Sequence, residues 1–206
     1  MKPPIQAVIF DFGNVISQVD SGPFLAALGR LSGLTPGEVH ERVFLGSPLS
    51  EDYESGRINS MEFREAVSEL CGTALAEEDL LIAFTEVFRP IESTQALIRH
   101  LKPHYRLGLL SNTNPWHFER GIRTSPVFPL FDTVTLSYEV GAMKPDPRIY
   151  WDALAKLGLP PEVCVFIDDR PEFTAAAETL GLQGIPYTGE ADLLLALGAL
   201  GLEGLQ

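Results

Sequence analysis

The sequence predicts an α/β fold in which a doubly wound parallel sheet is interrupted, after its first strand, by an inserted block of helices. Three observations support this prediction. The apolar run at residues 7–10 is typical of a strand that is buried on both faces. Residues 20–88 show only the apolar spacing of helices. From residue 91 onward, strand-like and helix-like segments alternate, as they do in parallel sheets with helices on both faces.

The inserted block has clear helix boundaries. Asn59 is a predicted N-cap because Glu62 follows three residues later, which is a capping-box pattern, and Gly72 can end that helix. Residues 54–57 lie before this helix and are expected to form a turn. The predicted helices span residues 20–31, 36–44, 59–70 and 77–88.

The rest of the chain supplies the sheet and the helices that cover it. Asn114 with Pro115, and Asp146 with Pro147, have the order expected of an N-cap and the first helical residue. Predicted strands span residues 107–110, 131–136, 163–167 and 184–187. Predicted helices span residues 93–101, 147–157, 171–180 and 191–200, with one more beginning at Pro115. We therefore expect a core of residues 1–16 and 90–206 and a helical cap of residues 17–89.

Composition excludes several classes of function. The chain has 206 residues, is 45% hydrophobic and has a formal net charge of −13. A protein this acidic lacks the basic surface that nucleic acids or anionic membranes require. Its two cysteines, Cys71 and Cys164, are far apart in apolar runs and are expected to be free thiols of a cytoplasmic protein. There is no His/Cys cluster with zinc-binding spacing, and the sequence does not indicate an oligomeric state.

Polar residues follow the strands in a consistent pattern. Asp11 follows the first strand, Ser111 follows the second, and Lys144 lies in a turn before a helix. The pair Asp168 and Asp169 ends the strand after that. Each of these residues could by itself be an ordinary turn or cap residue. Together they are expected to converge, because the carboxyl ends of parallel strands meet at one edge of the sheet.

Aspartate, serine, lysine and paired aspartates in this order resemble the four motifs of the haloacid dehalogenase (HAD) superfamily. The resemblance covers essentially the full chain and extends to the contexts of Ser111-Asn112 and Met143-Lys144-Pro145. It implies a Rossmann-like core with a helical cap that selects the substrate. The first motif, Asp-x-Gly-Asn-Val, is most similar to that of bacterial sugar-1-phosphate phosphatases.

The resemblance implies a Mg²⁺-dependent hydrolase of a small phosphorylated metabolite, with a sugar phosphate as the expected substrate. Asp11 is implied as the nucleophile that forms an aspartyl-phosphate, with Lys144 compensating its charge. The implied metal ligands are oxygens of Asp11, Gly13, Asp168 and Asp169, which are of the hard kind that Mg²⁺ prefers. The implied substrate-binding residues are Phe12, Gly13, Ser111, Asn112 and Lys144.

The sequence departs from the HAD pattern at Gly13, where the family usually has a second aspartate that acts as acid and base. Without it, we expect the rate to depend steeply on the basicity of the leaving oxygen, unless Glu54, Arg57 or His117 supplies the proton. A 2-haloacid dehalogenase is the alternative, because a halide leaves without a proton, although paired acids at 168–169 do not suit it. A HAD-like binding protein with little turnover is the other possibility.

Overall fold

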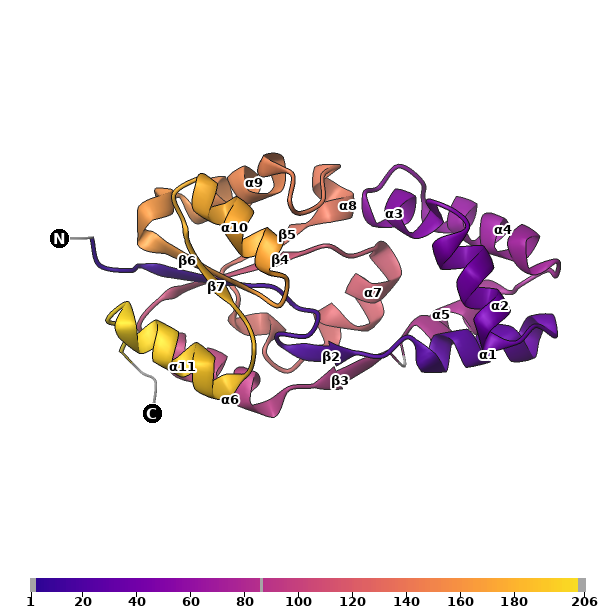
Figure 1. Cartoon of the computed structure of the whole chain (residues 1–206), viewed down its shortest axis with the longest axis horizontal. Helices are drawn as coiled ribbons and strands as arrows, with labels where there is room; N and C mark the ends of the chain where they lie inside the picture. The colour runs from indigo at the N-terminus through magenta and orange to yellow at the C-terminus, as the bar shows by residue number, and fades with distance from the viewer. Residues whose placement is uncertain (1–2, 86, 204–206) are drawn as a thin grey trace.

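The central feature of the computed structural model, which describes residues 3–85 and 87–203, is a five-stranded parallel sheet (Figure 1). Its strand order is β5-β4-β1-β6-β7, so β1 lies in the middle and pairs with β4 and β6. The strands are β1 Ala7–Phe10, β4 Arg106–Ser111, β5 Thr133–Leu136, β6 Cys164–Asp168 and β7 Gln183–Pro186. The predicted doubly wound fold is confirmed.

Helices cover both faces of this sheet, as the residues of β1 illustrate. Val8 and Phe10 belong to one hydrophobic cluster, which also contains residues of α6 and α11. Ala7 and Ile9 point the other way and belong to a second cluster, with residues of α9 and α10. Side chains of a strand alternate between faces, so an all-apolar strand fits between two helical layers. These helices are α6 Glu92–Leu101, α9 Pro147–Leu157, α10 Pro171–Thr179 and α11 Glu190–Ala199.

A second group of helices, which we call the cap, lies beyond the carboxyl edge of the sheet (Figure 1). It has its own hydrophobic cluster, to which Trp116 of the core also contributes. Its helices are α1 Gly22–Ser32, α2 Pro36–His40, α3 Leu49–Glu54, α4 Ser60–Cys71 and α5 Glu77–Thr85, with a π-helical turn at Glu41–Leu45. Within the described residues, no helix is both long and apolar enough to span a membrane.

A short antiparallel ribbon joins the cap to the core. It pairs β2 Ser17–Val19 with β3 Phe88–Pro90. The sequence prediction of helix as far as residue 88 is therefore wrong at its end, and residue 86 of that predicted helix lies outside the described residues. Three-residue strands have too few positions to show a periodicity, and their pairing joins segments that are distant in sequence. The exact limits of cap and core, at residues 17–89, stay a prediction.

The cap touches the core again at α8 Ser137–Val140, which lies against α3. Neither of these short helices was predicted. After α3, the turn at Gly56 approaches α8 so closely that an added Cβ would lie 2.3 Å from the Tyr138 carbonyl oxygen. The remaining short elements are α7 Pro115–Arg120 and 3-10 turns at Ile122–Thr124, Phe128–Leu130 and Pro161–Val163.

The predicted helix caps form as expected. The Asn59 side chain accepts hydrogen bonds from the Met61 and Glu62 amides, and the Glu62 carboxylate accepts one from the Asn59 amide. Asn114 and Asp146 likewise accept hydrogen bonds from backbone amides in the first turns of α7 and α9. Each of these caps depends on residues that are three or fewer positions apart, so it can be recognised in the sequence.

The approach of Gly56 to α8 predicts a large cost for any side chain there. Gly56→Ala should lower the free energy of unfolding by about 1–3 kcal/mol beyond the left-handed backbone cost, because the added Cβ meets a fixed carbonyl. The matched control is Gly72→Ala, which has a similar positive φ of 69° but no atom within 4 Å of the added Cβ. Urea denaturation of both variants gives the comparison. Equal destabilisation would show that the turn is not held against α8.

Candidate active site

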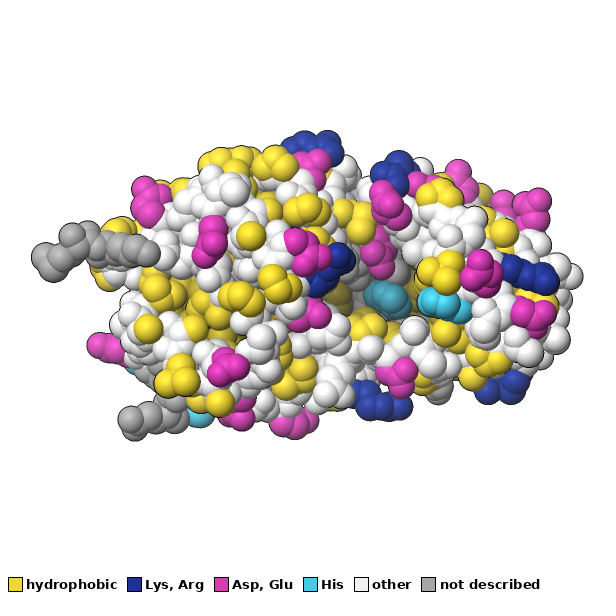
Figure 2. Space-filling view, viewed as in Figure 1, with side chains coloured by type: hydrophobic (Ala, Val, Ile, Leu, Met, Phe, Trp, Pro, Cys, Tyr) yellow, Lys and Arg dark blue, Asp and Glu magenta, His cyan; other side chains and the backbone are white. Residues whose placement is uncertain are grey.

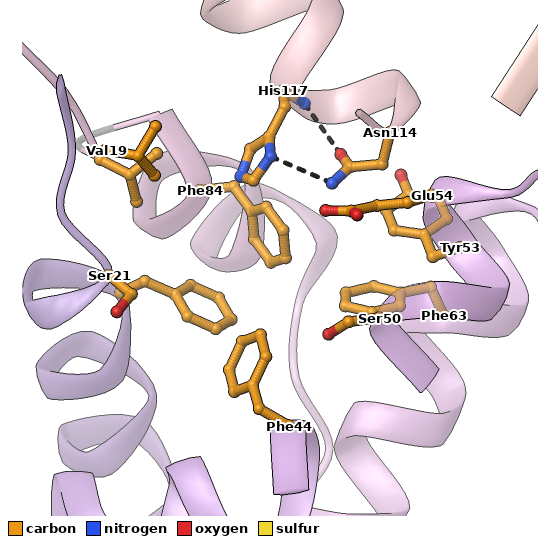
Figure 3. A pocket seen from close by; sticks show the side chains of 12 residues that line it. Val19, Ser21, Phe44, Ser50, Tyr53, Glu54, Phe63, Phe84, Asn114 and His117 are labelled. Carbon is orange, nitrogen blue, oxygen red and sulfur yellow. Dashed lines mark hydrogen bonds between the residues drawn. The ribbon is translucent and has the colours of Figure 1, made fainter. Parts of the chain in front are cut away.

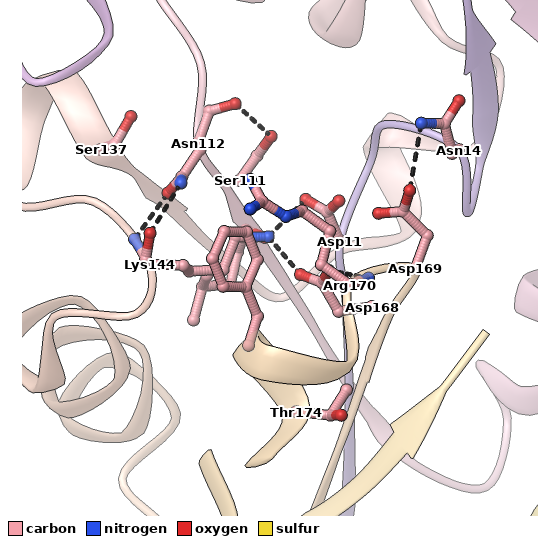
Figure 4. Close-up of polar contacts among 12 residues, drawn as sticks. Asp11, Asn14, Ser111, Asn112, Ser137, Lys144, Asp168, Asp169, Arg170 and Thr174 are labelled. Atoms are coloured by element: carbon pink, nitrogen blue, oxygen red, sulfur yellow. Dashed lines mark hydrogen bonds and ion pairs between the residues drawn. The ribbon is translucent and has the colours of Figure 1, made fainter. Parts of the chain in front are cut away.

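The polar residues singled out in the sequence lie together at the carboxyl edge of the sheet (Figure 4). Asp11 directly follows β1, Ser111 ends β4 and Asp168 ends β6. Lys144 reaches the same place from the loop between α8 and α9. The order of the strands explains this, because β1 lies between β4 and β6 and the three strands are parallel.

Lys144 is the buried cation of the site. Its Nζ lies 2.8 Å from Oδ1 of Asp11 and 2.5 Å from Oδ2 of Asp168, and its side chain is 1% exposed. The rings of Phe166 and Phe173 lie beside the ammonium group. Burial raises the pKa of Asp11 to about 7, even though the charge of Lys144 acts to lower it. Burial also raises the pKa of Asp168, again against the effect of Lys144.

Asn112 fixes the backbone that presents this lysine. Its Oδ1 accepts a hydrogen bond from the Lys144 amide at 2.8 Å, and its Nδ2 donates to the Lys144 carbonyl oxygen at 3.1 Å. The Asn112 side chain is therefore bonded to Lys144. The predicted contact of Asn112 with phosphate would involve its backbone amide. The Ser111 hydroxyl lies 3.4 Å from the Asn112 carbonyl oxygen, a weak contact that a ligand oxygen could replace.

Three carboxylates form a compact acidic cluster. Asp11, Asp168 and Asp169 each place one oxygen within 4.8 Å of the others. Asn14 holds the outer member, because its Nδ2 donates to Oδ2 of Asp169 at 3.1 Å. The Arg170 amide donates to Oδ1 of Asp168 at 2.9 Å. Hard oxygens at this spacing fit a divalent cation such as Mg²⁺.

The loop after β1 differs in detail from expectation. The positive φ in this loop, 55°, is at Asn14 and not at Gly13. An added Cβ at Gly13 would meet only a Val19 methyl group at 3.4 Å. The Phe12 side chain is buried against the ring of Phe88, with the ring centroids 5.5 Å apart. A contact of Phe12 with substrate, if it occurs, therefore involves its backbone.

A pocket opens between the cap and the core, and one of its lining residues, Glu54, is close enough to Asp11 to be affected by its charge. Figure 2 shows the molecule hollowed there, with acidic, basic and histidine side chains gathered around the hollow. Most of the pocket wall is apolar, and Glu54, Asn114 and His117 lie near one another on one side of it (Figure 3). Its other lining residues are Val19, Ser21, Phe24, Phe44, Ser50, Tyr53, Phe63, Phe84 and Val87.

The three cap and loop residues named as possible proton donors have different surroundings. Glu54 projects into the pocket, and burial, followed by the charge of Asp11, raises its pKa to about 7. His117 also lines the pocket, and burial lowers its pKa to about 4. Arg57 lies in a second cleft, which Asn112 and Lys144 also line, and it pairs there with Glu51 and Asp52.

Two positioning residues were not identified from the sequence. Asn14 lies in the first motif and orients Asp169. Its position next to Gly13 was the sequence feature that could have identified it. Ser137 lies outside the motifs. Its hydroxyl bonds to the Glu54 carbonyl oxygen at 2.5 Å and accepts a hydrogen bond from the Thr113 amide at 2.9 Å. No sequence pattern marks such a link, because it joins three distant segments.

Known proteins are similar to this chain in sequence and in fold. The D-ribitol-5-phosphate phosphatase of Bacteroides thetaiotaomicron is 27% identical over 195 residues, covering 91% of this chain and 94% of that protein. The structure of a predicted HAD-like hydrolase from Porphyromonas gingivalis superposes with a TM-score of 0.82 at 30% identity, covering 98% of this chain and all of that one.

A further structure shares the fold at lower identity. It is a HAD family enzyme from B. thetaiotaomicron in complex with magnesium and inorganic phosphate, with a TM-score of 0.78 and 24% identity over 88% of this chain and 93% of that one. The family model of the haloacid dehalogenase-like hydrolases matches residues 5–181. With the four strand-end motifs assembled at one edge of the sheet, the chain belongs to the haloacid dehalogenase-like hydrolase family.

Proposed function

We propose that this hydrolase is a Mg²⁺-dependent phosphatase of small phosphate monoesters and that Asp11 is its covalent nucleophile. One observation is the main support. The Asp11 carboxylate lies against buried Lys144 and beside Asp168 and Asp169, and its charge acts on Glu54, which lines a pocket that can hold an ester. The relative that hydrolyses ribitol 5-phosphate supports the same reaction class.

In the proposed reaction, an oxygen of Asp11 attacks phosphorus and the bond to the leaving oxygen breaks. Water then attacks the aspartyl-phosphate and regenerates the Asp11 carboxylate. Splitting one displacement into two is the general advantage of covalent catalysis. Lys144 holds its charge beside Asp11 throughout, and the Ser111 hydroxyl and nearby backbone amides are available to phosphoryl oxygens.

The acidic cluster is the proposed metal site. Asp11 and Asp168, with Asp169 and the Gly13 carbonyl oxygen, would hold Mg²⁺ directly or through water. When bound, the ion supplies positive charge where the nucleophile and the phosphate, both anions, must approach each other. Burial already raises the pKa of Asp11 and of Asp168, so a cation beside them would relieve a charge that Lys144 alone does not balance.

The pocket also limits the substrate. Five aromatic rings line it, and the Tyr53 hydroxyl is bonded to Ser60. Both polar groups of the Asn114 side chain are bonded to His117. A polyol would find partners only at Ser21, Ser50, Glu54 and His117, and each hydroxyl left unpaired would cost about 1–3 kcal/mol. The pocket therefore favours an ester whose alcohol has an apolar or aromatic part, and the sugar phosphate expected from sequence is the competing prediction.

The nucleophile is tested by Asp11→Asn. This change keeps the volume but removes the attacking oxygen, so turnover of 4-nitrophenyl phosphate should fall by about 10⁴-fold or more. Asp192→Asn, on the exposed surface of α11, is the matched control and should keep full activity. Beryllium fluoride should form an adduct on Asp11. Substantial activity of Asp11→Asn would show that another group is the covalent centre.

Removal of the metal separates the proposed reaction from its alternatives. EDTA should stop phosphatase activity and Mg²⁺ should restore it, because three carboxylates this close repel one another without a cation. Asp169→Asn should raise the Mg²⁺ concentration needed for half activity. Release of chloride from 2-chloropropionate that EDTA does not affect would instead indicate a dehalogenase. Neither activity over broad substrate panels would indicate a binding protein.

Substrate preference can be measured with two esters of primary alcohols. We expect kcat/KM for 2-phenylethyl phosphate to exceed that for ribitol 5-phosphate by about 10-fold or more, since burying one aromatic ring contributes roughly 1.5–3 kcal/mol. Phe44→Ser, in the pocket wall, should reduce this preference. Ile82→Ser, an exposed cap position, is the control and should leave the preference unchanged. Faster turnover of ribitol 5-phosphate would favour the sugar phosphate.

A further inference from the structure

The proposed phosphatase reaction lacks a proton donor in its first motif. An alkoxide leaving group takes a proton as the ester bond breaks, and the water that attacks later must lose one. Gly13 stands where the family usually has the aspartate that performs both transfers, and glycine has no side chain to do so. The candidate donors in the protein are therefore side chains that the cap and the loop after β4 bring to the site.

Two of the three candidate donors are excluded by their surroundings. The Arg57 guanidinium is paired with Glu51 and Asp52, and these hydrogen bonds raise its pKa, so it does not give up its proton. His117 is in the pocket, but its pKa of about 4 makes it a neutral imidazole at ordinary pH. Its Nδ1 faces the Asn114 amide nitrogen, because Oδ1 of Asn114 accepts the His117 backbone amide. This network places the single ring proton on Nε2, where a neutral ring donates a hydrogen bond but is a poor acid.

The third candidate, Glu54, is held in place from the core. The Ser137 hydroxyl bonds to its carbonyl oxygen and also to the Thr113 amide, two residues after Ser111. The Gly56 turn that follows is in van der Waals contact with α8. The end of α3 is therefore fixed against the loop that is proposed to bind phosphate. From this anchored backbone the Glu54 carboxylate projects into the pocket, beside Asn114 and His117 (Figure 3).

The charges around Glu54 favour a carboxyl group that can exchange protons near neutral pH. Burial is the largest cause of its raised pKa of about 7, and the negative charges of Asp11 and Glu51 act in the same direction. Lys144 acts in the opposite direction, and neutral His117 adds no charge from α7. A general acid is most effective when its pKa lies near the working pH.

We propose that Glu54, presented by the cap, is the general acid and base of the reaction. This inference rests on the proposed phosphatase function. As Asp11 attacks phosphorus, the electron pair of the breaking bond goes to the leaving oxygen, which takes the proton of the Glu54 carboxyl group and departs as an alcohol. The Glu54 carboxylate then takes a proton from water as that water attacks the aspartyl-phosphate, and phosphate leaves with Asp11 restored.

The test is the dependence of kcat/KM on the leaving group in the full chain with Mg²⁺. For Glu54→Gln, kcat/KM for 2-phenylethyl phosphate should fall by about 10²–10⁴-fold, because an alkoxide must be protonated as it leaves. For 2,4-dinitrophenyl phosphate, kcat/KM should change by less than about 10-fold, because this phenolate needs no proton. The same variant should release a burst of dinitrophenol equal to the enzyme concentration, because hydrolysis of the aspartyl-phosphate then lacks its base.

Two variants serve as controls. Glu78→Gln, at an exposed position of the cap helix α5, removes a carboxylate that does not act on Glu54, so it should leave the leaving-group dependence unchanged. Glu54→Asp retains a carboxyl group and should recover part of the lost alkyl phosphatase activity. An equal loss on both substrates, or no loss on either, would overturn the role of Glu54. The proposed phosphatase function is tested independently of Glu54. It would be wrong if Asp11→Asn retained activity on the dinitrophenyl ester.

Discussion

The site depends on one buried interaction, the ammonium group of Lys144 between the carboxylates of Asp11 and Asp168. Isolated charges are costly in a protein interior, so each of the three groups needs the others. Each comes from a different segment, and Asn112 clamps the lysine backbone from both sides. The parallel sheet holds this arrangement in place, because Asp11 follows β1, Asp168 ends β6, and these two strands pair with each other.

Three carboxylates against one lysine leave the cluster with an excess of negative charge. Burial is the main cause of the raised pKa of Asp11 and of Asp168, and the neighbouring carboxylates add to it. Asn14 orients Asp169 without neutralising it. The cluster therefore offers oxygen ligands for a cation, and hydrogen bonds hold those ligands in position. The net charge of the whole chain does not indicate this local arrangement.

Sequence reasoning succeeded where the signal is local and failed where it depends on distant partners. Asp11 and the paired acids were found because strand ends and apolar runs are legible, and the Asn59 cap because its partners lie within three residues. The β2–β3 ribbon and the contact of α3 with α8 were missed, since each joins short segments far apart in the chain.

The absence of a side chain at Gly13 changes how cap and core cooperate. Where an acid stands two residues after the nucleophile, both groups belong to the same loop of the core. If Glu54 is the donor, the acid and the nucleophile belong to different parts of the molecule and meet only when α3 is seated on Ser137. Placement of the cap would then control both access to the pocket and the proton supply, so that chemistry on poor leaving groups requires the closed arrangement.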